Sequence, residues 1–195
     1  MKVWTGDSNS IMKILGSRVN AKEDREENDY YATEPVAVEM LCELEMFSNQ
    51  IWECACGQGH ISKVLEQRGY TVKSTDLIDR GFGDPGIDFL KSTDLFSGDI
   101  VTNPPSKYAQ EFVEHALDLI PEGNKVAMLL RLQFLEGQKR RDLFLLSPPK
   151  TVYVSSSRLD CAKNGEFKGV TRAVAYAWFI WEKGFDGVTQ IKWFN

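Results

Sequence analysis

The residues with the clearest chemical potential lie in the stretch from Asp99 to Ser106, whose sequence is DIVTNPPS. Its β-branched residues predict a short buried strand, and the two prolines end that strand because they lack amide hydrogens. In open α/β sheets, ligands bind at the carboxyl edge of the strands. A rigid turn at that edge would present the Asn103 side-chain amide and the Pro104 carbonyl to a ligand. Taken alone, the same residues also fit an ordinary strand and turn.

A second candidate binding element lies upstream, in the sequence ECACGQG from Glu53 to Gly59. The pattern predicts a strand over 50–55, a glycine turn over 56–59 and a helix over 60–68, the opening of a nucleotide-binding βαβ unit. Glycines let the backbone amides of such a turn come close to a ligand at a helix amino terminus. The spacing is shorter than GxGxxG, and no P-loop lysine follows, which argues against NAD and ATP.

Asp76 is the third candidate, at the end of a strand predicted over 70–75. It follows the glycine turn by about 20 residues, where an acidic side chain can accept hydrogen bonds from both hydroxyls of a ribose. Glycine turns and strand-end aspartates are each common. The three elements in this order are far more specific than any one of them.

The remaining segments supply the elements that position these groups. Apolar residues at helical spacing, and apolar runs bounded by turn residues, predict an alternation of helices and strands. The expected elements are helices over 35–47, 112–120 and 136–146, strands over 125–132, 151–157 and 173–181, and loops over 77–98 and 158–172.

Several residues are expected to fix the ends of these elements. Thr33 can cap the first helix, and Pro35 suits its first turn. Trp193 and Phe194 are expected to pack the last segment against the core. His60 and His115 have no partner visible in the sequence and are predicted to lie on helix surfaces.

Length and composition favour one globular domain. The chain has 195 residues, of which 43% are hydrophobic and 26% charged, as in ordinary globular proteins. Residues 1–28 lack periodicity and are expected to form a flexible arm, whereas residues 29–195 form one domain. No apolar run approaches a membrane span and no signal peptide is evident, so a cytoplasmic protein is expected.

The four cysteines do not form a metal-binding or disulfide pattern. Cys54 and Cys56 would share one face of a strand, and we expect both to be small buried residues. No metal is therefore expected. The net charge of −5 argues against general binding to nucleic acid, although residues 100–172 carry more basic than acidic side chains.

The motifs YYATEP, ECACGQG, Asp76, DFL and DIVTNPPS, in this order, resemble those of class I S-adenosylmethionine-dependent methyltransferases. They are most similar to the amino-methylating branch that carries (D/N/S)PP(Y/F/W). The segments FLEGQKR and AWFIWEKG also look similar to phage and prophage N6-adenine methyltransferases. The resemblance implies a Rossmann-like α/β fold with a seven-stranded, mostly parallel sheet, helices on both faces and an antiparallel last strand.

The resemblance also implies a site for S-adenosyl-L-methionine. Asp76 would hold the ribose of this cofactor, and Asp88 with Phe89 would contact its adenine. The residues implied for the methionine end are Tyr31, Thr33 and Pro35, those implied for the cofactor turn are Glu53, Cys56, Gly57 and Gly59, and Asn103 would touch the cofactor as well as the substrate.

The implied chemistry is methylation of a neutral amine. The lone pair of such an amine is delocalised into its ring, so it is a poor nucleophile. The Asn103 side-chain oxygen and the Pro104 carbonyl could accept its two N–H groups, and these bonds would strengthen as positive charge develops on the nitrogen. The implied catalytic segment comprises Asn103, Pro104, Pro105, Ser106 and Tyr108.

The fourth position of the motif is Ser106, where the family has an aromatic residue that stacks on the target base. Serine cannot stack, and a flipped base needs an apolar face. Tyr108 or Phe134 could supply it, and ordinary packing is the alternative for both.

The loop 158–172 is a candidate surface for the substrate. Basic residues interleaved with an aromatic one can follow a phosphate backbone, although a solvated loop is nearly as well supported. The basic residues are Arg158, Lys163, Lys168 and Arg172, with Phe167 between them.

The predicted function is transfer of a methyl group from S-adenosylmethionine to the N6 amine of adenine in DNA. The chain is short for a separate target-recognition domain, so loose sequence specificity or a specificity partner is expected. Two alternatives stay open: an RNA or protein-glutamine N-methyltransferase, and a cofactor-binding protein that has lost catalysis.

Overall fold

The computed structural model describes residues 30–157, 159, 161–163 and 174–194. The arm predicted for residues 1–28 lies outside the described residues. Most of the predicted basic loop does so as well.

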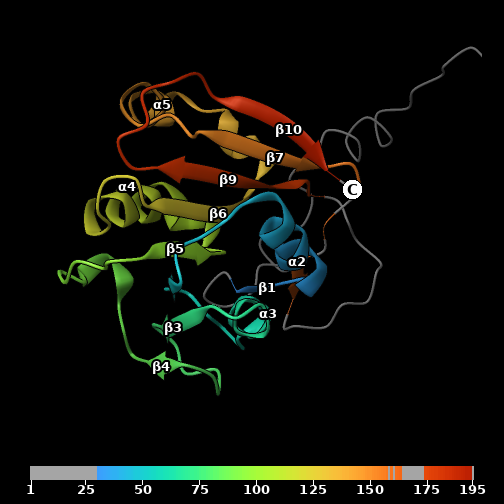
Figure 1. The fold of residues 1–195 in the computed structure, drawn as a ribbon, viewed down its shortest axis with the longest axis vertical. Coiled ribbons are helices and arrows are strands. Elements are labelled where there is room, and N and C mark those ends of the chain that lie inside the picture. The colour runs from blue at the N-terminus through green and yellow to red at the C-terminus, as the bar shows by residue number, and fades with distance from the viewer. Residues whose placement is uncertain (1–29, 158, 160, 164–173, 195) are drawn as a thin grey trace, which may run out of the picture.

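One mixed sheet forms the centre of the described part of the chain. Its strands run in the order β10-β7-β9-β6-β5-β2-β3-β4, and Figure 1 shows them stacked from β10 at the top to β4 at the bottom. Neighbouring strands are parallel, except that β9 runs antiparallel to β6 and to β7. The strands are β2 (Gln50–Glu53), β3 (Thr71–Asp76), β4 (Asp84–Pro85), β5 (Asp99–Thr102), β6 (Lys125–Arg131), β7 (Thr151–Ser155), β9 (Tyr176–Glu182) and β10 (Gln190–Phe194).

This architecture confirms the predicted α/β class, with a mostly parallel sheet and an antiparallel strand near the end of the chain. The sheet of the described residues has eight strands where seven were expected, because the segment 190–194 adds to β7 as an edge strand. Strand β2 lies between β3 and β5, so the order of the strands reverses there. The carboxyl ends of β2 and β5 therefore meet at a switch point, the usual place for a ligand in such sheets.

Helices cover both faces of the sheet. Helices α2 (Pro35–Leu44) and α3 (His60–Gln67) pack on one face, and α4 (Ala109–Leu119) and α5 (Arg141–Leu146) on the other. The side chains of successive strand residues point to opposite faces of the sheet. Ile51 packs with α2 and α3, whereas Trp52 packs with α4. Because each fully buried large apolar side chain contributes about 1.5–3 kcal/mol, this double-sided core fixes the register of the strands.

A separate antiparallel ribbon lies outside the main sheet, formed by β1 (Tyr31–Thr33) and β8 (Cys161–Lys163). Its backbone register places Tyr31 opposite Lys163 and Thr33 opposite Cys161. The sequence predicted no strand in either segment, and the 158–172 loop was expected to be irregular. Three-residue strands leave no periodicity, and these two pair across some 130 residues of chain.

Several element ends differ from those predicted. Thr33 does not cap α2: its N-cap position is Glu34, without a side-chain cap, and Pro35 begins the helix as expected. The helix predicted over 136–146 is limited to α5, preceded by a 3-10 turn at Gln138–Arg140. Gly137 has φ = 136°, outside the helical region, so the predicted helix from residue 136 cannot run through it. Further 3-10 turns occur at Phe89–Lys91, Ser106–Tyr108 and Leu132–Leu135.

The end of the chain packs only in part as predicted. Phe194 is buried and meets the ring of Tyr153 edge-on, with 6.4 Å between the ring centroids. The expectation for Trp193 is wrong, because its side chain is 70% exposed. Adjacent residues of an edge strand point to opposite faces, so one of the two is left without cover.

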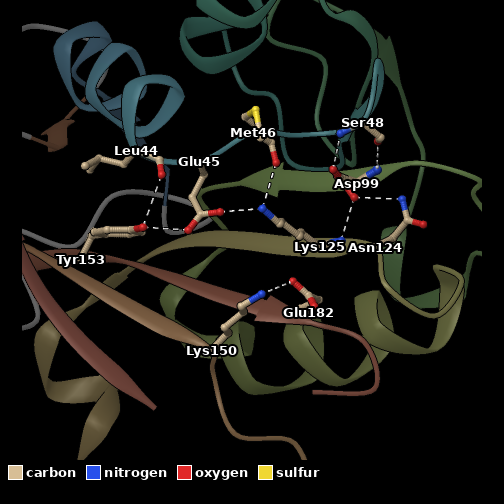
Figure 2. Close-up of polar contacts among 10 residues, drawn as sticks. All are labelled: Leu44, Glu45, Met46, Ser48, Asp99, Asn124, Lys125, Lys150, Tyr153 and Glu182. Carbon is tan, nitrogen blue, oxygen red and sulfur yellow. Dashed lines mark hydrogen bonds and ion pairs between the residues drawn. The ribbon is translucent and has the colours of Figure 1, made fainter. Parts of the chain in front are cut away.

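The amino-terminal edge of the sheet carries a dense polar network, drawn in Figure 2. Lys125 donates to Glu45 at 2.6 Å and to the Met46 carbonyl at 2.9 Å, and the Tyr153 hydroxyl donates to the other oxygen of Glu45 at 2.8 Å. Burial is the largest cause that raises the pKa of Tyr153 above its usual value, and the hydrogen bond with Glu45 raises this pKa further. The network ties α2 to β6 and β7.

Asp99, at the start of β5, holds the other half of this edge (Figure 2). One carboxylate oxygen accepts from the Asn124 side chain at 2.9 Å and from the Lys125 amide at 2.7 Å, and the other accepts from the Ser48 amide at 2.6 Å. The Asp99 amide in turn donates to the Ser48 hydroxyl at 3.0 Å. Asp99 therefore joins β5 to the segments that precede β2 and β6.

Candidate active site

A cavity of about 810 Å³ opens at the carboxyl edge of the sheet. Its volume is in the range of small-molecule and cofactor sites. It collects most of the predicted site residues, although they come from distant parts of the chain. Those that line it are Tyr31, Thr33, Glu53, Cys56, Asp76, Asp88, Phe89, Asn103, Pro104, Pro105, Ser106 and Tyr108.

Other predicted site residues do not line the cavity. Pro35, Gly57 and Gly59 lie in elements next to it. Arg158, Lys168 and Arg172 lie outside the described residues, and of Lys163 only its place in β8 is described. A site for a phosphate backbone on these four residues therefore stays a prediction.

Asn103 follows β5 and is fixed by β1. Its side-chain nitrogen donates to the Tyr31 carbonyl and to the Thr33 hydroxyl oxygen, both at 3.0 Å. Two donors thus meet two acceptors. The side-chain oxygen is left to accept a hydrogen bond from a ligand in the cavity that Asn103 lines.

Asp76 ends β3 and is held by backbone amides. Its two oxygens accept from the Gly57 and Ile78 amides, both at 2.8 Å. Each carboxylate oxygen has two acceptor sites, so both oxygens can still bind a ligand hydroxyl.

The glycine turn behaves differently from the expectation that its amides approach a ligand. The Cys56 amide donates to the Thr75 carbonyl, the Gly57 amide to Asp76, and the Gly59 amide to the Cys56 carbonyl. The remaining amide, of Gln58, donates to the Tyr30 hydroxyl at 3.3 Å. All four amides therefore donate within the protein, and those of Gly57 and Gln58 help to position Asp76 and Tyr30.

Aromatic rings explain the two glycines of this turn. Gly57 and Gly59 have φ values of 55° and 78°, which favour glycine. A Cβ at Gly57 would clash with the ring of Tyr30, and one at Gly59 would lie 2.5 Å from the ring of Phe82. The glycines therefore admit two rings beside the cavity.

Glu53 is a buried carboxyl group at the end of β2. It accepts hydrogen bonds from the amide of Ser62, at 2.8 Å, and from the Ser62 hydroxyl. Burial raises the pKa of Glu53 from 4.5 to about 8, against the effect of these two bonds. The group is consequently largely neutral at pH 7, and a cation bound beside it would favour its ionised form.

Cys54 and Cys56 are buried, as predicted. Burial raises the pKa of both thiols, that of Cys56 to about 12, so neither is a thiolate at neutral pH. The part of the chain that the structure describes contains no cluster of histidine, cysteine and acidic residues that could hold a metal ion.

Tyr108 offers the ring nearest in sequence to the missing aromatic residue. It lies in the 3-10 turn Ser106–Tyr108, lines the cavity and is 41% exposed. The Lys107 ammonium donates to its hydroxyl at 3.0 Å and lies 4.8 Å from its ring centroid.

Phe134 does not reach the cavity, contrary to one of the two alternatives. It is 7% exposed and meets the rings of Phe144 and Phe179 edge-on at 5.8 and 5.6 Å. The Arg140 guanidinium covers it at 4.8 Å. After β6 the chain turns toward the face that carries α5, so Phe134 enters the core beneath that helix.

Several residues that line the cavity were not predicted from the sequence. Leu77 and Ile87 are exposed apolar side chains in the loop after Asp76. Leu77 directly follows the predicted ribose ligand, and this position could have indicated a surface for a flat ring. Other missed residues are Tyr30, Arg80, Lys91, Lys107 and Tyr176. Tyr176 begins β9, and only the antiparallel direction of that strand brings it to this edge.

The two histidines are less exposed to solvent than predicted. His60 lines the cavity, and burial lowers the pKa of its imidazole. His115 has its Nε2 atom 3.0 Å from the Ser92 carbonyl and meets the ring of Phe89 edge-on at 5.1 Å. His115 therefore helps to hold the segment that carries Phe89.

Comparisons with solved structures define the fold. A protein from Listeria monocytogenes, assigned to the class I S-adenosylmethionine-dependent methyltransferases, superimposes with a TM-score of 0.60 and 12% identity, over 95% of this chain and 69% of its own. A protein from Pyrococcus horikoshii, assigned as an RNA methyltransferase, gives 0.57 and 13%, over 93% and 100%. The modification subunit of an assigned type I restriction enzyme from Vibrio vulnificus gives 0.55 and 14%, over 93% and 49%.

These matches show that the chain has the Rossmann-like fold of class I methyltransferases. No family model matches the sequence, and no curated protein matches it. Within the described residues, no helix is long and apolar enough to cross a membrane.

Proposed function

We propose that this protein transfers a methyl group from S-adenosylmethionine to the N6 amine of adenine in DNA. The observation that carries the proposal is the acceptor pair at the end of β5. The Asn103 side-chain nitrogen is engaged by β1, so its oxygen is the atom presented to a substrate. Together with the Pro104 carbonyl it forms two acceptors, which suit the two hydrogens of an amino group.

The acceptor pair would act on the transition state more than on the bound substrate. A planar aromatic amine keeps its lone pair in the ring and has little positive charge. As the nitrogen becomes tetrahedral and cationic, its N–H groups become stronger donors to Asn103 and Pro104. Removing one preorganised hydrogen-bonding group of this kind typically lowers kcat by about 10²–10³-fold.

The cavity suits the parts of S-adenosylmethionine, whose sulfonium would supply the electrophilic methyl group. Asp76 has acceptor sites for the ribose hydroxyls, and Leu77 and Ile87 offer apolar surface for the adenine. Glu53 lies in the same cavity, where ionisation of its carboxyl group would match a positively charged ligand. Asp88 lines the cavity beside Phe89 and could accept from the adenine amino group.

The substrate end of the site supports a flat, anionic acceptor. Tyr108 has an exposed ring on which a base can stack, in place of the aromatic residue that Ser106 lacks. Lys107 lies beside it and adds a positive charge near which a phosphate could bind. The Vibrio vulnificus neighbour is a modification subunit of a restriction enzyme, which agrees with DNA as the acceptor.

RNA is the second candidate acceptor, because the neighbour assigned as an RNA methyltransferase is matched over its whole length. Its chain has no additional domain beyond the matched part. The acceptor pair and the exposed ring serve an amine of RNA equally well.

Transfer of tritiated methyl groups from S-adenosylmethionine to DNA, RNA and protein tests the proposal. Plasmid DNA from a strain without adenine methylation, transfer RNA and total protein serve as acceptors, with Asn103→Ala as the inactive variant. Asn49→Ala, an exposed asparagine at the opposite edge of the sheet, is the matched control. Label in N6-methyladenine of DNA that disappears only in Asn103→Ala is expected.

Label in RNA or protein alone would replace DNA by that acceptor. Cofactor binding without label in any acceptor would favour a protein that has lost catalysis. Label on DNA that persists in Asn103→Ala would remove the acceptor pair from the mechanism.

A further inference from the structure

We infer that Thr33, together with the backbone carbonyl of Tyr31, is a positioning residue that fixes the orientation of the Asn103 amide. The inference rests on the proposed function, since it assigns a cause to the acceptor that this function needs. The resemblance implied for Thr33 only a place near the cofactor. Its hydroxyl oxygen instead accepts a hydrogen bond from Asn103 at 3.0 Å.

The chemistry of the contacts decides which end of the amide faces β1. A carbonyl oxygen can only accept, so the Asn103 atom 3.0 Å from the Tyr31 carbonyl must be the nitrogen. The second hydrogen of that nitrogen then meets the Thr33 hydroxyl oxygen. The reversed amide would place its oxygen against the Tyr31 carbonyl, where two acceptors repel.

The Asn103 amide needs a partner that fixes its orientation, because it can rotate, whereas the other member of the acceptor pair, the Pro104 carbonyl, cannot rotate in this way. The Pro104 carbonyl is part of the backbone, and Pro104 itself is buried. The Asn103 amide can rotate about its side-chain torsions, and the terminal torsion is two-fold. A half turn would present N–H groups to the N–H groups of the substrate and would abolish acceptance.

The hydrogen-bond acceptors that fix the Asn103 amide belong to β1, which lies outside the sheet that carries Asn103. Strand β1 pairs with β8 rather than with β5, and Thr33 is separated from Asn103 by 70 positions in the sequence. Thr33 is 2% exposed, so water cannot replace its hydroxyl when it is removed. The β1–β8 ribbon therefore sets the polarity of the acceptor site.

The test compares Thr33→Val, which keeps the shape and loses the hydroxyl, with Thr33→Ser, which keeps the hydroxyl. With tritiated S-adenosylmethionine and unmethylated plasmid DNA, Thr33→Val is expected to lower kcat about tenfold, which corresponds to about 1.4 kcal/mol. The KM for the cofactor should stay the same, and Thr33→Ser should restore most of the lost rate. In an Asn103→Ala background, Thr33→Val should have no further effect.

A spectroscopic measurement follows the amide itself. The Asn103 side-chain NH₂ signals are identified in ¹⁵N NMR spectra by their absence in Asn103→Ala. They should exchange with water faster in Thr33→Val than in the wild type and Thr33→Ser, at unchanged thermal midpoints. Equal exchange in Thr33→Val and wild type would overturn the inference.

The kinetic outcomes separate this inference from the proposed function. A raised cofactor KM with unchanged kcat in Thr33→Val would assign Thr33 to the cofactor and overturn the inference while methylation stands. Absence of methyl transfer by the wild type to DNA, RNA and protein would overturn the proposed function, and the positioning role inferred for Thr33 with it. Amide exchange would then report only on the hydrogen bond from Asn103 to Thr33.

Discussion

The two ends of strand β5 show how the same sheet builds a rigid edge and a reactive one. At the amino-terminal end, Asp99 accepts three hydrogen bonds, from Ser48, Asn124 and Lys125, all within the protein (Figure 2). At the other end, Asn103 uses its donors within the protein and turns its acceptor toward the cavity. The two ends are separated by only a few residues.

The two edges of the sheet differ in how fully the hydrogen-bonding capacity of their polar groups is used within the protein. The amino-terminal edge pairs each carboxylate with donors from neighbouring segments, as in the contact of Glu45 with Lys125 and Tyr153. The carboxyl-terminal edge fixes its polar groups from one side and leaves lone pairs of Asp76 and Asn103 on the other. Buried groups with spare hydrogen-bonding capacity mark a ligand site, because an unused polar group is costly to bury.

The largest expected effect is the loss of methyl transfer in Asn103→Ala. The variant removes one of the two acceptors, so we expect kcat to fall about 10³-fold. The free energy of unfolding should fall by only about 1–2 kcal/mol, because two hydrogen bonds to β1 are lost from a side chain that is only partly buried. Single-turnover methyl transfer and urea unfolding measure the two quantities.

Asn49→Ala should change neither quantity, because that side chain is exposed. A larger loss of stability in Asn103→Ala would mean that the polar groups at this end of β5 stabilise the fold as strongly as those at the other end.

The converse variant is Asp99→Ala at the opposite end of β5. It leaves the donors of Ser48, Asn124 and Lys125 without their acceptor, so the free energy of unfolding should fall by about 3 kcal/mol. The kcat of the folded fraction should be unchanged, because Asp99 lies at the edge away from the cavity. Urea unfolding, with methyl transfer measured well below the transition, tests both statements.

Asp142→Ala is the matched control, since this aspartate is exposed in the first turn of α5. It should change stability by less than about 0.5 kcal/mol. A loss of kcat in folded Asp99→Ala would show that the two edges are coupled.

The carboxyl-terminal edge was the more predictable of the two from the sequence. A strand followed by Pro104 and Pro105 must end there, and Asp76 likewise stands at the end of a predicted strand, so local residue chemistry places both at the same edge. The order of the core strands and helices followed from periodicity for the same reason. The amino-terminal network depends on partners far apart, such as Asp99 with Ser48 at a separation of 51 positions, and no local pattern indicates it.

Other features were hidden because tertiary contacts decide them. The β1–β8 ribbon and its contact with Asn103 join segments that carry no strand periodicity. Phe134 was one of two candidates for the missing ring, with ordinary packing as its alternative, and the direction of the chain after β6 places it in the core. The amides of the glycine turn were expected to meet a ligand, but all four donate within the protein, to partners that include Asp76 and Tyr30.

Stability should depend on pH through Glu53, the buried carboxyl group of the carboxyl-terminal edge. Its hydrogen-bond donors are the amide and hydroxyl of Ser62, whereas Glu45 at the other edge has the ammonium of Lys125. Because burial raises the pKa of Glu53 to about 8, the folded state binds its proton more tightly than the unfolded state. The free energy of unfolding should therefore fall as pH rises from about 4.5 to about 8, by up to about 1.4 kcal/mol per pH unit.

Glu53→Gln, which does not titrate, isolates this contribution. Its unfolding free energy minus that of the wild type should increase with pH across the same window. Urea unfolding at intervals from pH 5 to pH 8 gives the difference. Parallel curves for the two proteins would show that Glu53 titrates normally in the folded state.

The smallest expected effect concerns Tyr108, the exposed ring at the mouth of the cavity. Tyr108→Ala removes a stacking surface worth about 1–3 kcal/mol per base, so kcat/KM for DNA should fall by about 5- to 150-fold. The affinity for S-adenosylmethionine, measured by calorimetry, should stay within about twofold. Stability should also be nearly unaffected, since Tyr108 is 41% exposed.

Tyr108→Phe separates the ring from its hydroxyl group. It keeps the stacking face and loses only the hydrogen bond from Lys107, so its kcat/KM for DNA should remain close to that of the wild type. Equal losses in both variants would assign the effect to the contact with Lys107. Unchanged kinetics in Tyr108→Ala would remove Tyr108 from the site and leave the missing ring of Ser106 to another wall of the cavity, where Tyr176 also lies.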